Sequence, residues 1–175
     1  PISLFGRDWF SKPYKNLMVY EDDDGLIELP APKLLGAHQF ENAGIAINAL
    51  KRLEVKSTSL SNSVQNVIWP ARLHKLKSGP LVRKLTNLPH PGELWIDGGH
   101  NQAAGIAISN ALEQLPRGRT NILICGMLKT KDLKAFLNPL FNSAKFLYGI
   151  RIQGEENSDS AETIVNQARE IGFSA

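Results

Sequence analysis

One segment of the sequence combines a carboxylate, two glycines and a histidine between a predicted strand and a predicted helix. It is Asp-Gly-Gly-His-Asn at residues 97–101, directly after the apolar run at residues 94–96. Ligands of open α/β sheets bind beyond the carboxyl ends of the strands, where Asp97 can accept hydrogen bonds from a ribose. Glycines let the backbone approach a ligand closely, and the amides at a helix start attract anions. The alternative is a tight strand-to-helix turn in which Asp97 or Asn101 caps the helix.

Two other polar residues have the chemistry of nucleotide contacts. Arg72 follows Trp69-Pro70-Ala71, and a guanidinium beside a rigid proline segment can be aimed at a phosphate, whose oxygens it pairs with two at a time. Asn42 lies near the start of a predicted helix, and its amide has the donor and the acceptor that an adenine edge requires. The alternatives are a surface arginine beside a domain hinge for Arg72 and helix capping for Asn42.

The loop at residues 126–132, Gly-Met-Leu-Lys-Thr-Lys-Asp, follows another apolar run. Lys131 or Asp132 can face a cleft there, but a helix start with Asp132 favourable to the helix dipole is the preferred interpretation. The four histidines have no metal-ligand spacing and Cys125 is the only cysteine, so we expect no zinc site. Cys125 lies within an apolar strand pattern, which indicates a core residue rather than a nucleophile.

Apolar periodicity predicts the elements that carry these residues. We expect a hairpin with strands at 17–20 and 26–29 and a turn at 21–25, and then a helix over 40–53. Residues 55–63 are a linker or a short helix that continues to Val67. Beyond Pro70 strands and helices alternate, with strands at 94–96, 121–125 and from 146, and helices over 101–114, 131–142 and 160–171. This alternation predicts an α/β fold with a mostly parallel sheet whose faces are covered.

Composition excludes several classes of protein. Hydrophobic residues make up 42% of the 175 residues, enough for a core and unlike a disordered or fibrous chain. The net charge of +3 is spread along the chain. The densest basic cluster, at residues 72–84, lacks the interleaved aromatic residues of a nucleic-acid module. No apolar run is long enough to span a membrane. A single cysteine and no signal peptide favour the cytoplasm, and both ends of the chain suggest a piece of a longer protein.

Four of these segments occur together in an order that resembles the dihydrofolate synthase/folylpolyglutamate synthase family of the Mur ligase superfamily. That family has Gly-x-His-Gln-x-x-Asn-Ala, then Trp-Pro-Gly-Arg-Leu, Asp-Gly-Ala-His-Asn and Gly-x-Leu-x-Asp-Lys-Asp. This sequence has its counterparts at 36–43, 69–73, 97–101 and 126–132. Ala71 stands where glycine is usual, Gly99 where alanine is usual, and Thr130 where aspartate is common.

The resemblance implies the tail of an ATPase domain over residues 1–64. Over residues 65–175 it implies a Rossmann-like, mostly parallel sheet with flanking helices, the Mur ligase C-terminal domain. It places Asn42 at the adenine, Arg72 at the phosphates, Asp97 at the ribose and His100 beside the nucleotide. Arg72 and His100 are then the candidate catalytic residues.

The implied activity is ATP-dependent joining of L-glutamate to dihydropteroate, to folylpolyglutamates, or to both, by a cytoplasmic monomer that uses Mg²⁺ and an acyl phosphate. No Gly-x-x-x-x-Gly-Lys-[Ser/Thr] loop occurs in the sequence. We therefore expect the chain to hold only part of the ATP site, to lack the magnesium ligands and to be inactive alone. Two alternatives stay open: another Mur-type ligase that builds cell-wall precursors, and a nucleotide-binding module without chemistry.

Overall fold

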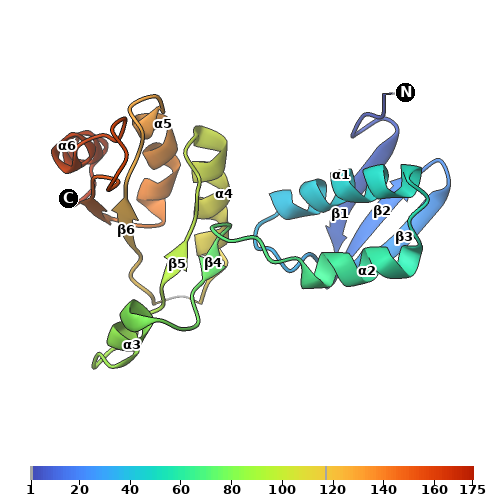
Figure 1. Ribbon diagram of the computed structural model, residues 1–175, viewed down its shortest axis with the longest axis horizontal. Helices are drawn as coiled ribbons and strands as arrows, with labels where there is room; N and C mark the ends of the chain where they lie inside the picture. The colour runs from blue at the N-terminus through green and yellow to red at the C-terminus, as the bar shows by residue number, and fades with distance from the viewer. Residues whose placement is uncertain (1, 117) are drawn as a thin grey trace. The chain divides into compact units, whose positions relative to one another are not determined.

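The computed structural model describes residues 2–116 and 118–175, and the chain forms two compact units, residues 1–97 and 98–175 (Figure 1). This division follows the packing of the chain. It does not test the domain boundary between residues 64 and 65 that the family resemblance implies. The assignment of residues 1–64 and 65–175 to an ATPase tail and a C-terminal domain therefore stays a prediction.

The first unit begins with an antiparallel sheet of three strands in the order β1 (Trp9–Tyr14), β2 (Leu17–Asp22) and β3 (Gly25–Pro30). The predicted hairpin is confirmed: Asp22 pairs with Gly25, whose positive φ of 118° suits glycine. Helix α1 (His38–Arg52) packs on β1 and helix α2 (Ser57–Asn66) packs on β3. Trp9, Met18, Tyr20, Leu29, Ile47 and Leu60 are buried in the core of this unit.

The rest of the first unit contains two very short strands, β4 (His74–Lys75) and β5 (Trp95–Ile96), with the short helix α3 (Pro80–Thr86) between them. The predicted strand at 94–96 is present as β5, but it pairs antiparallel with β4. The alternation of strands and helices did not indicate this partner, because two residues are too few to show a periodicity.

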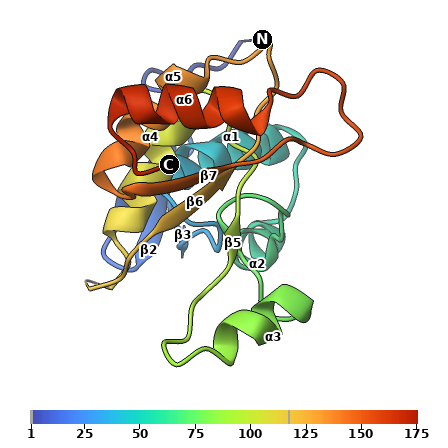
Figure 2. The ribbon, with the colours of Figure 1, turned by 90° about the vertical axis from the view of Figure 1, so that its left-hand side faces the viewer.

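The second unit contains α4 (Gln102–Glu113), β6 (Ile122–Cys125), α5 (Leu133–Leu137), a 3₁₀ helix (Asn138–Asn142), β7 (Phe146–Gly149) and α6 (Ala161–Ile171). Strands β6 and β7 pair in parallel, as the sequence predicts. In Figure 2, α6 runs along this strand pair, and it packs against β7 and α5. The centre of the core of the second unit contains Leu137, Leu140, Leu147 and Ile164.

Only one face of the β6–β7 pair is buried within its unit. Leu147 and Cys125 face the helices, whereas Ile124 and Tyr148 are each 64% exposed. The prediction of two covered faces is therefore wrong for this strand pair within the described residues. Successive side chains of a strand point to opposite faces, and the helices of this unit pack on one face only.

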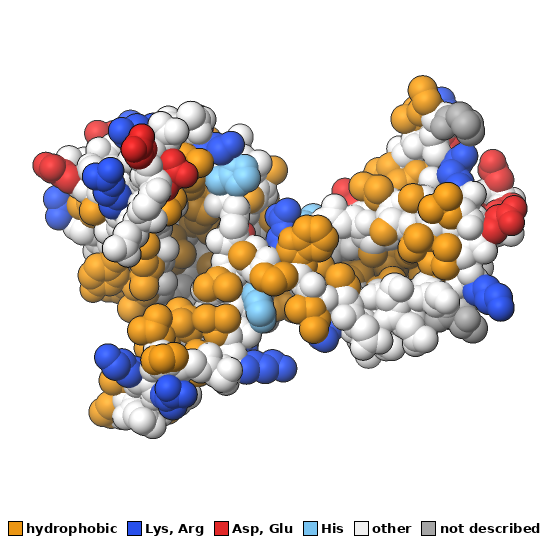
Figure 3. All heavy atoms as spheres, viewed as in Figure 1, with side chains coloured by type: hydrophobic (Ala, Val, Ile, Leu, Met, Phe, Trp, Pro, Cys, Tyr) orange, Lys and Arg blue, Asp and Glu red, His pale blue; other side chains and the backbone are white. Residues whose placement is uncertain are grey.

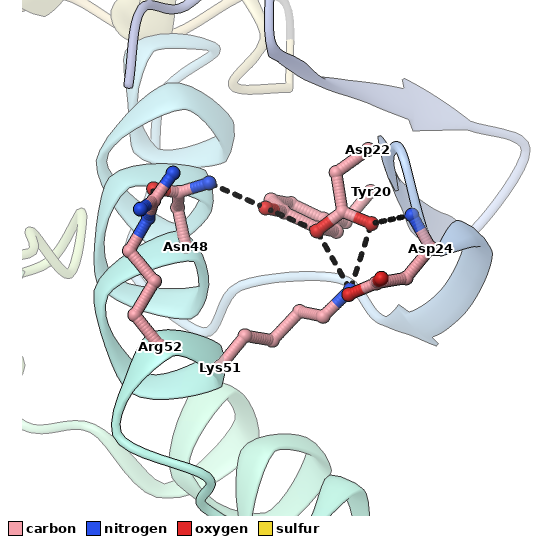
Figure 4. A network of polar contacts seen from close by, with 6 residues as sticks. All are labelled: Tyr20, Asp22, Asp24, Asn48, Lys51 and Arg52. Atoms are coloured by element: carbon pink, nitrogen blue, oxygen red, sulfur yellow. Dashed lines mark hydrogen bonds and ion pairs between the residues drawn. The ribbon is translucent and has the colours of Figure 1, made fainter. Parts of the chain in front are cut away.

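A partly buried ion pair joins the end of α1 to the β2–β3 hairpin (Figure 4). The Lys51 ammonium donates to both carboxylate oxygens of Asp22, at 2.7 and 2.6 Å, and lies 3.2 Å from Asp24. The Tyr20 hydroxyl donates to Asp22 and accepts from the Asn48 amide. Partial burial alone would raise the pKa of Asp22, but the hydrogen bonds from Lys51 and Tyr20 outweigh it and lower the pKa.

We expect Asp22→Asn to reduce the unfolding free energy by about 2 kcal/mol at pH 7, because charge-assisted hydrogen bonds are lost. The pKa of Asp22 is lowered in the folded state, so its contribution is fully present above the ordinary value of 3.8 and is lost as the pH falls through the folded value. Urea unfolding of both proteins between pH 7 and pH 2 measures the difference. Asp23→Asn, at the exposed turn, is the control; an Asp22 effect that persists in acid would contradict this account.

Candidate functional site

A cavity of about 410 Å³ lies between α1, α2 and the segment that follows α2. Figure 3 shows hydrophobic side chains along the hollow between α1 and α2. Most lining residues are apolar, and the polar ones are Gln39, Asn42, Ser63 and Arg72. Small-molecule sites are commonly apolar cavities with a few polar groups that fix the orientation of the ligand. This cavity brings together two residues that the sequence singles out, Asn42 and Arg72.

A short chain of hydrogen bonds orients Asn42 on α1. Its side-chain nitrogen donates to the Gln39 amide oxygen at 3.2 Å, and the Gln39 nitrogen lies 2.8 Å from His38 Nε2. Gln39 is only 5% exposed, so it forms a fixed support. Asn42 keeps its carbonyl oxygen and a second N–H for a ligand. The N-cap position of α1 is Ala37, and no side chain forms a capping hydrogen bond there. The capping alternative for Asn42 therefore does not hold.

Arg72 lies between two residues with left-handed backbones. Ala71 has a φ of 56° and Leu73 a φ of 42°, and non-glycine residues in this region cost on the order of 1–3 kcal/mol each. The Leu73 side chain is buried, which helps to hold the turn, while Arg72 is exposed at the cavity. Ala71 stands at the position where the family pattern has glycine, which adopts a positive φ without strain.

Asp97 lies next to this turn. Its carboxylate oxygen Oδ2 accepts a hydrogen bond from the Leu73 backbone N–H at 2.7 Å. Asp97 follows β5 directly, and Leu73 precedes β4 directly. The structure therefore connects two of the predicted site residues, Arg72 and Asp97, through one backbone amide.

His100 belongs to the second unit. It is exposed, and its Nδ1 lies 3.0 Å from the Gly98 carbonyl oxygen. The neighbouring Asn101 caps α4 by accepting the Ala104 N–H at 2.9 Å. The capping role that the sequence left open between Asp97 and Asn101 thus belongs to Asn101.

The loop at residues 126–132 is tied to the loop that follows β7. The Lys129 N–H donates to the Asn157 carbonyl at 2.8 Å, and the Asp159 N–H donates to the Met127 carbonyl at 2.8 Å. Asp132 caps α5 by accepting the Ala135 N–H, which confirms the helix-start interpretation. Cys125 is buried, and burial raises its pKa to about 11, which agrees with a core residue.

Within residues 2–116 and 118–175, no group of three histidine, cysteine, aspartate or glutamate side chains is arranged to hold a metal ion. Over the same residues, no helix has both the length and the apolar character needed to cross a membrane.

Sequence comparison identifies a curated relative. The chain is 31% identical over 163 residues to the folylpolyglutamate synthase of Lacticaseibacillus casei, which covers 86% of this chain and 35% of that protein. No family model matches the chain. The chain is therefore similar to part of a folylpolyglutamate synthase. It spans about a third of the length of that relative.

Solved structures of the folylpolyglutamate synthase family share the fold. Escherichia coli FolC in complex with DHPP and ADP matches with a TM-score of 0.76 at 22% identity, over 94% of this chain and 36% of FolC. A bifunctional folylpolyglutamate synthase/dihydrofolate synthase with Mn, AMPPNP and L-glutamate bound matches with a TM-score of 0.76 at 20% identity, over 95% and 37% of the two chains. At these low identities the structural likeness shows the fold alone, and that fold is the one of the C-terminal part of FolC.

Gln39 is a residue of the candidate site that the sequence analysis missed. It lies in the segment at residues 36–43 that resembles the family pattern. A signal was available, because residues three apart on a helix face the same side. A glutamine three positions before Asn42 therefore can reach it, although its burial is visible only in the structure.

Proposed function

We propose that the protein containing this chain is an ATP-dependent ligase that joins L-glutamate to dihydropteroate, to folylpolyglutamates, or to both. In this proposal the chain supplies part of the ATP site. The observation that carries the proposal is that Asn42 and Arg72 line one and the same cavity, in a chain with a curated relative that is a folylpolyglutamate synthase.

Each predicted site residue has a role in this proposal. The Asn42 amide binds the adenine edge, because its oxygen and its second N–H match the donor and acceptor there. The Arg72 fork neutralises phosphate charge, and Asp97 accepts hydrogen bonds from the ribose. His100, an exposed residue in the loop before α4, is a neighbour of the nucleotide.

The proposed reaction activates a carboxylate. The carboxylate of the pterin substrate attacks the γ-phosphate of ATP and forms an acyl phosphate with release of ADP. The amine of glutamate then attacks the acyl carbon, and phosphate leaves as the amide forms. Catalysis of phosphoryl transfer depends on positioning and on neutralisation of charge, which is the work we assign to Arg72. Mg²⁺ would neutralise phosphate charge, and we expect its ligands to lie in other parts of the protein.

Phosphate release by the full-length protein tests the proposal. The reaction contains ATP, Mg²⁺ and L-glutamate, with either dihydropteroate or tetrahydrofolate as the acceptor. Release that depends on an acceptor supports a folate ligase and names its substrate. A folded protein that binds ATP but releases no phosphate with either acceptor would point to another Mur-type ligase or to a binding module.

Asn42→Ala is expected to raise the KM for ATP about tenfold while changing kcat little, because it removes hydrogen bonds to the base that are made equally in the ground and transition states. Steady-state kinetics of phosphate release at varied ATP concentration measures both constants. Asn66→Ala is the matched control, since Asn66 lies on α2 outside the cavity lining and bonds the Asn62 carbonyl. An unchanged KM in Asn42→Ala would remove Asn42 from the adenine site.

A further inference from the structure

The backbone turn that carries Arg72 has a conformation that its own residues disfavour. Ala71 and Leu73, on either side of Arg72, both have a positive φ. A left-handed conformation is an outlier for a side chain as bulky as leucine. Such conformations persist only where the surrounding structure holds them, and they are common at functional sites. The neighbours that hold this turn therefore decide where the Arg72 guanidinium points.

Asp97 is one of these neighbours, and the strand register places it there. His74 pairs with Ile96 and Lys75 pairs with Trp95 in the β4–β5 ladder. The next pair in this register is Leu73 with Asp97. At this position the carboxylate, rather than a backbone carbonyl, accepts the Leu73 N–H at 2.7 Å. A charged acceptor makes a stronger hydrogen bond than a neutral carbonyl does.

We propose that Asp97 is a positioning residue for Arg72: its carboxylate holds the left-handed turn at Ala71–Leu73 and so directs the guanidinium into the cavity. This inference rests on the proposed function, and it goes beyond a ribose contact. It assigns Asp97 an effect on phosphate binding even where the ligand has no ribose. It also gives a reason for Ala71 to be tolerated where glycine is usual, because the Asp97 bond stabilises a conformation that alanine disfavours.

Inorganic tripolyphosphate separates the two roles of Asp97, because it has phosphates but no ribose. We expect Asp97→Ala in the full-length protein to weaken tripolyphosphate binding about tenfold, measured by isothermal titration calorimetry with Mg²⁺ present. Arg72→Ala should weaken it by a similar factor. The double variant should bind no more weakly than Arg72→Ala alone, because both changes remove the same contact.

Two further variants test the mechanism of positioning. Asp97→Asn keeps an oxygen that can accept the Leu73 N–H, so its tripolyphosphate affinity should stay within about threefold of the wild type. Ala71→Gly, added to Asp97→Ala, should restore part of the lost affinity, since glycine adopts the positive φ at position 71 without strain. Hydrogen exchange gives a readout that needs no ligand: the Leu73 amide should exchange faster in Asp97→Ala than in Asp97→Asn.

The outcomes distinguish this inference from the proposed function. Weaker ATP binding but unchanged tripolyphosphate binding in Asp97→Ala would overturn the inference and leave Asp97 as a ribose contact. Additive losses in the double variant, or unchanged exchange of the Leu73 amide, would also overturn it. A folded wild-type protein that binds neither ATP nor tripolyphosphate would overturn the proposed function, and the inference with it.

Discussion

Arg72→Ala is expected to lower the turnover of the proposed full-length ligase about 100-fold or more, the scale of losing one electrostatic donor to a transition state. Among the residues that the structure describes, Arg72 is the one arginine that lines the cavity, and its turn holds it at that surface. In the proposed reaction the negative charge on the phosphate oxygens is redistributed in the transition state, where we expect the Arg72 guanidinium to stabilise it most, so the loss should appear in kcat more than in the KM for ATP. Phosphate release at saturating ATP measures it.

Two variants make this result interpretable. Arg72→Lys keeps the charge but loses the planar fork, so its turnover should lie between those of the wild type and Arg72→Ala. Arg83→Ala is the matched control, because Arg83 lies on α3 outside the cavity lining. Near-normal turnover in Arg72→Ala, or an equal loss in Arg83→Ala, would reject the role of Arg72 at the phosphates.

The second prediction with a large expected effect concerns the stability of the folded protein. Gly105→Ala should lower the unfolding free energy by about 1–3 kcal/mol, the scale of overpacking in a core. Gly105 is buried on α4, and a Cβ there would collide with the Phe136 backbone carbonyl oxygen of α5. A backbone atom cannot move aside as a flexible side chain does. Alanine gains up to about 1 kcal/mol of helix propensity over glycine, which reduces the loss.

Chemical denaturation of the two proteins at one pH measures this effect. The control is Asn110→Ala, at an exposed position of the same helix, where the expected change is within about 0.5 kcal/mol. If Gly105→Ala were as stable as the wild type, α4 and α5 would not be packed as closely as the structure places them. The packing bears on the site as well, because α4 begins directly after His100 and Asn101.

Ala71 belongs to the backbone turn that carries Arg72. Ala71 stands where the family pattern has glycine, and the two residues differ little in size. The structure gives this replacement a different meaning, because the φ of 56° is a conformation that glycine adopts easily and alanine does not. The departure therefore makes the turn depend on its supports, the buried Leu73 side chain and the hydrogen bond to Asp97.

Local signals in the sequence determined many of the elements. The hairpin at Asp22–Gly25, the amphipathic helix α1 and the start of α5 at Asp132 depend on turn preference, periodicity and capping, which act over a few residues. The same kind of signal marked Asn42, Arg72, Asp97 and His100 by their chemistry and by the order of their motifs. Their roles at a nucleotide remain predictions that the experiments above test.

Only the tertiary structure decided which of these residues meet. Asn42 and Arg72 are far apart in the sequence, and no local pattern places both at one cavity. The burial of Gln39, the pairing of β4 with β5 and the bond from Leu73 to Asp97 were likewise absent from the sequence analysis. Each depends on contacts between distant segments, and such contacts form only when the burial of apolar surface outweighs the entropy lost in closing the chain between them.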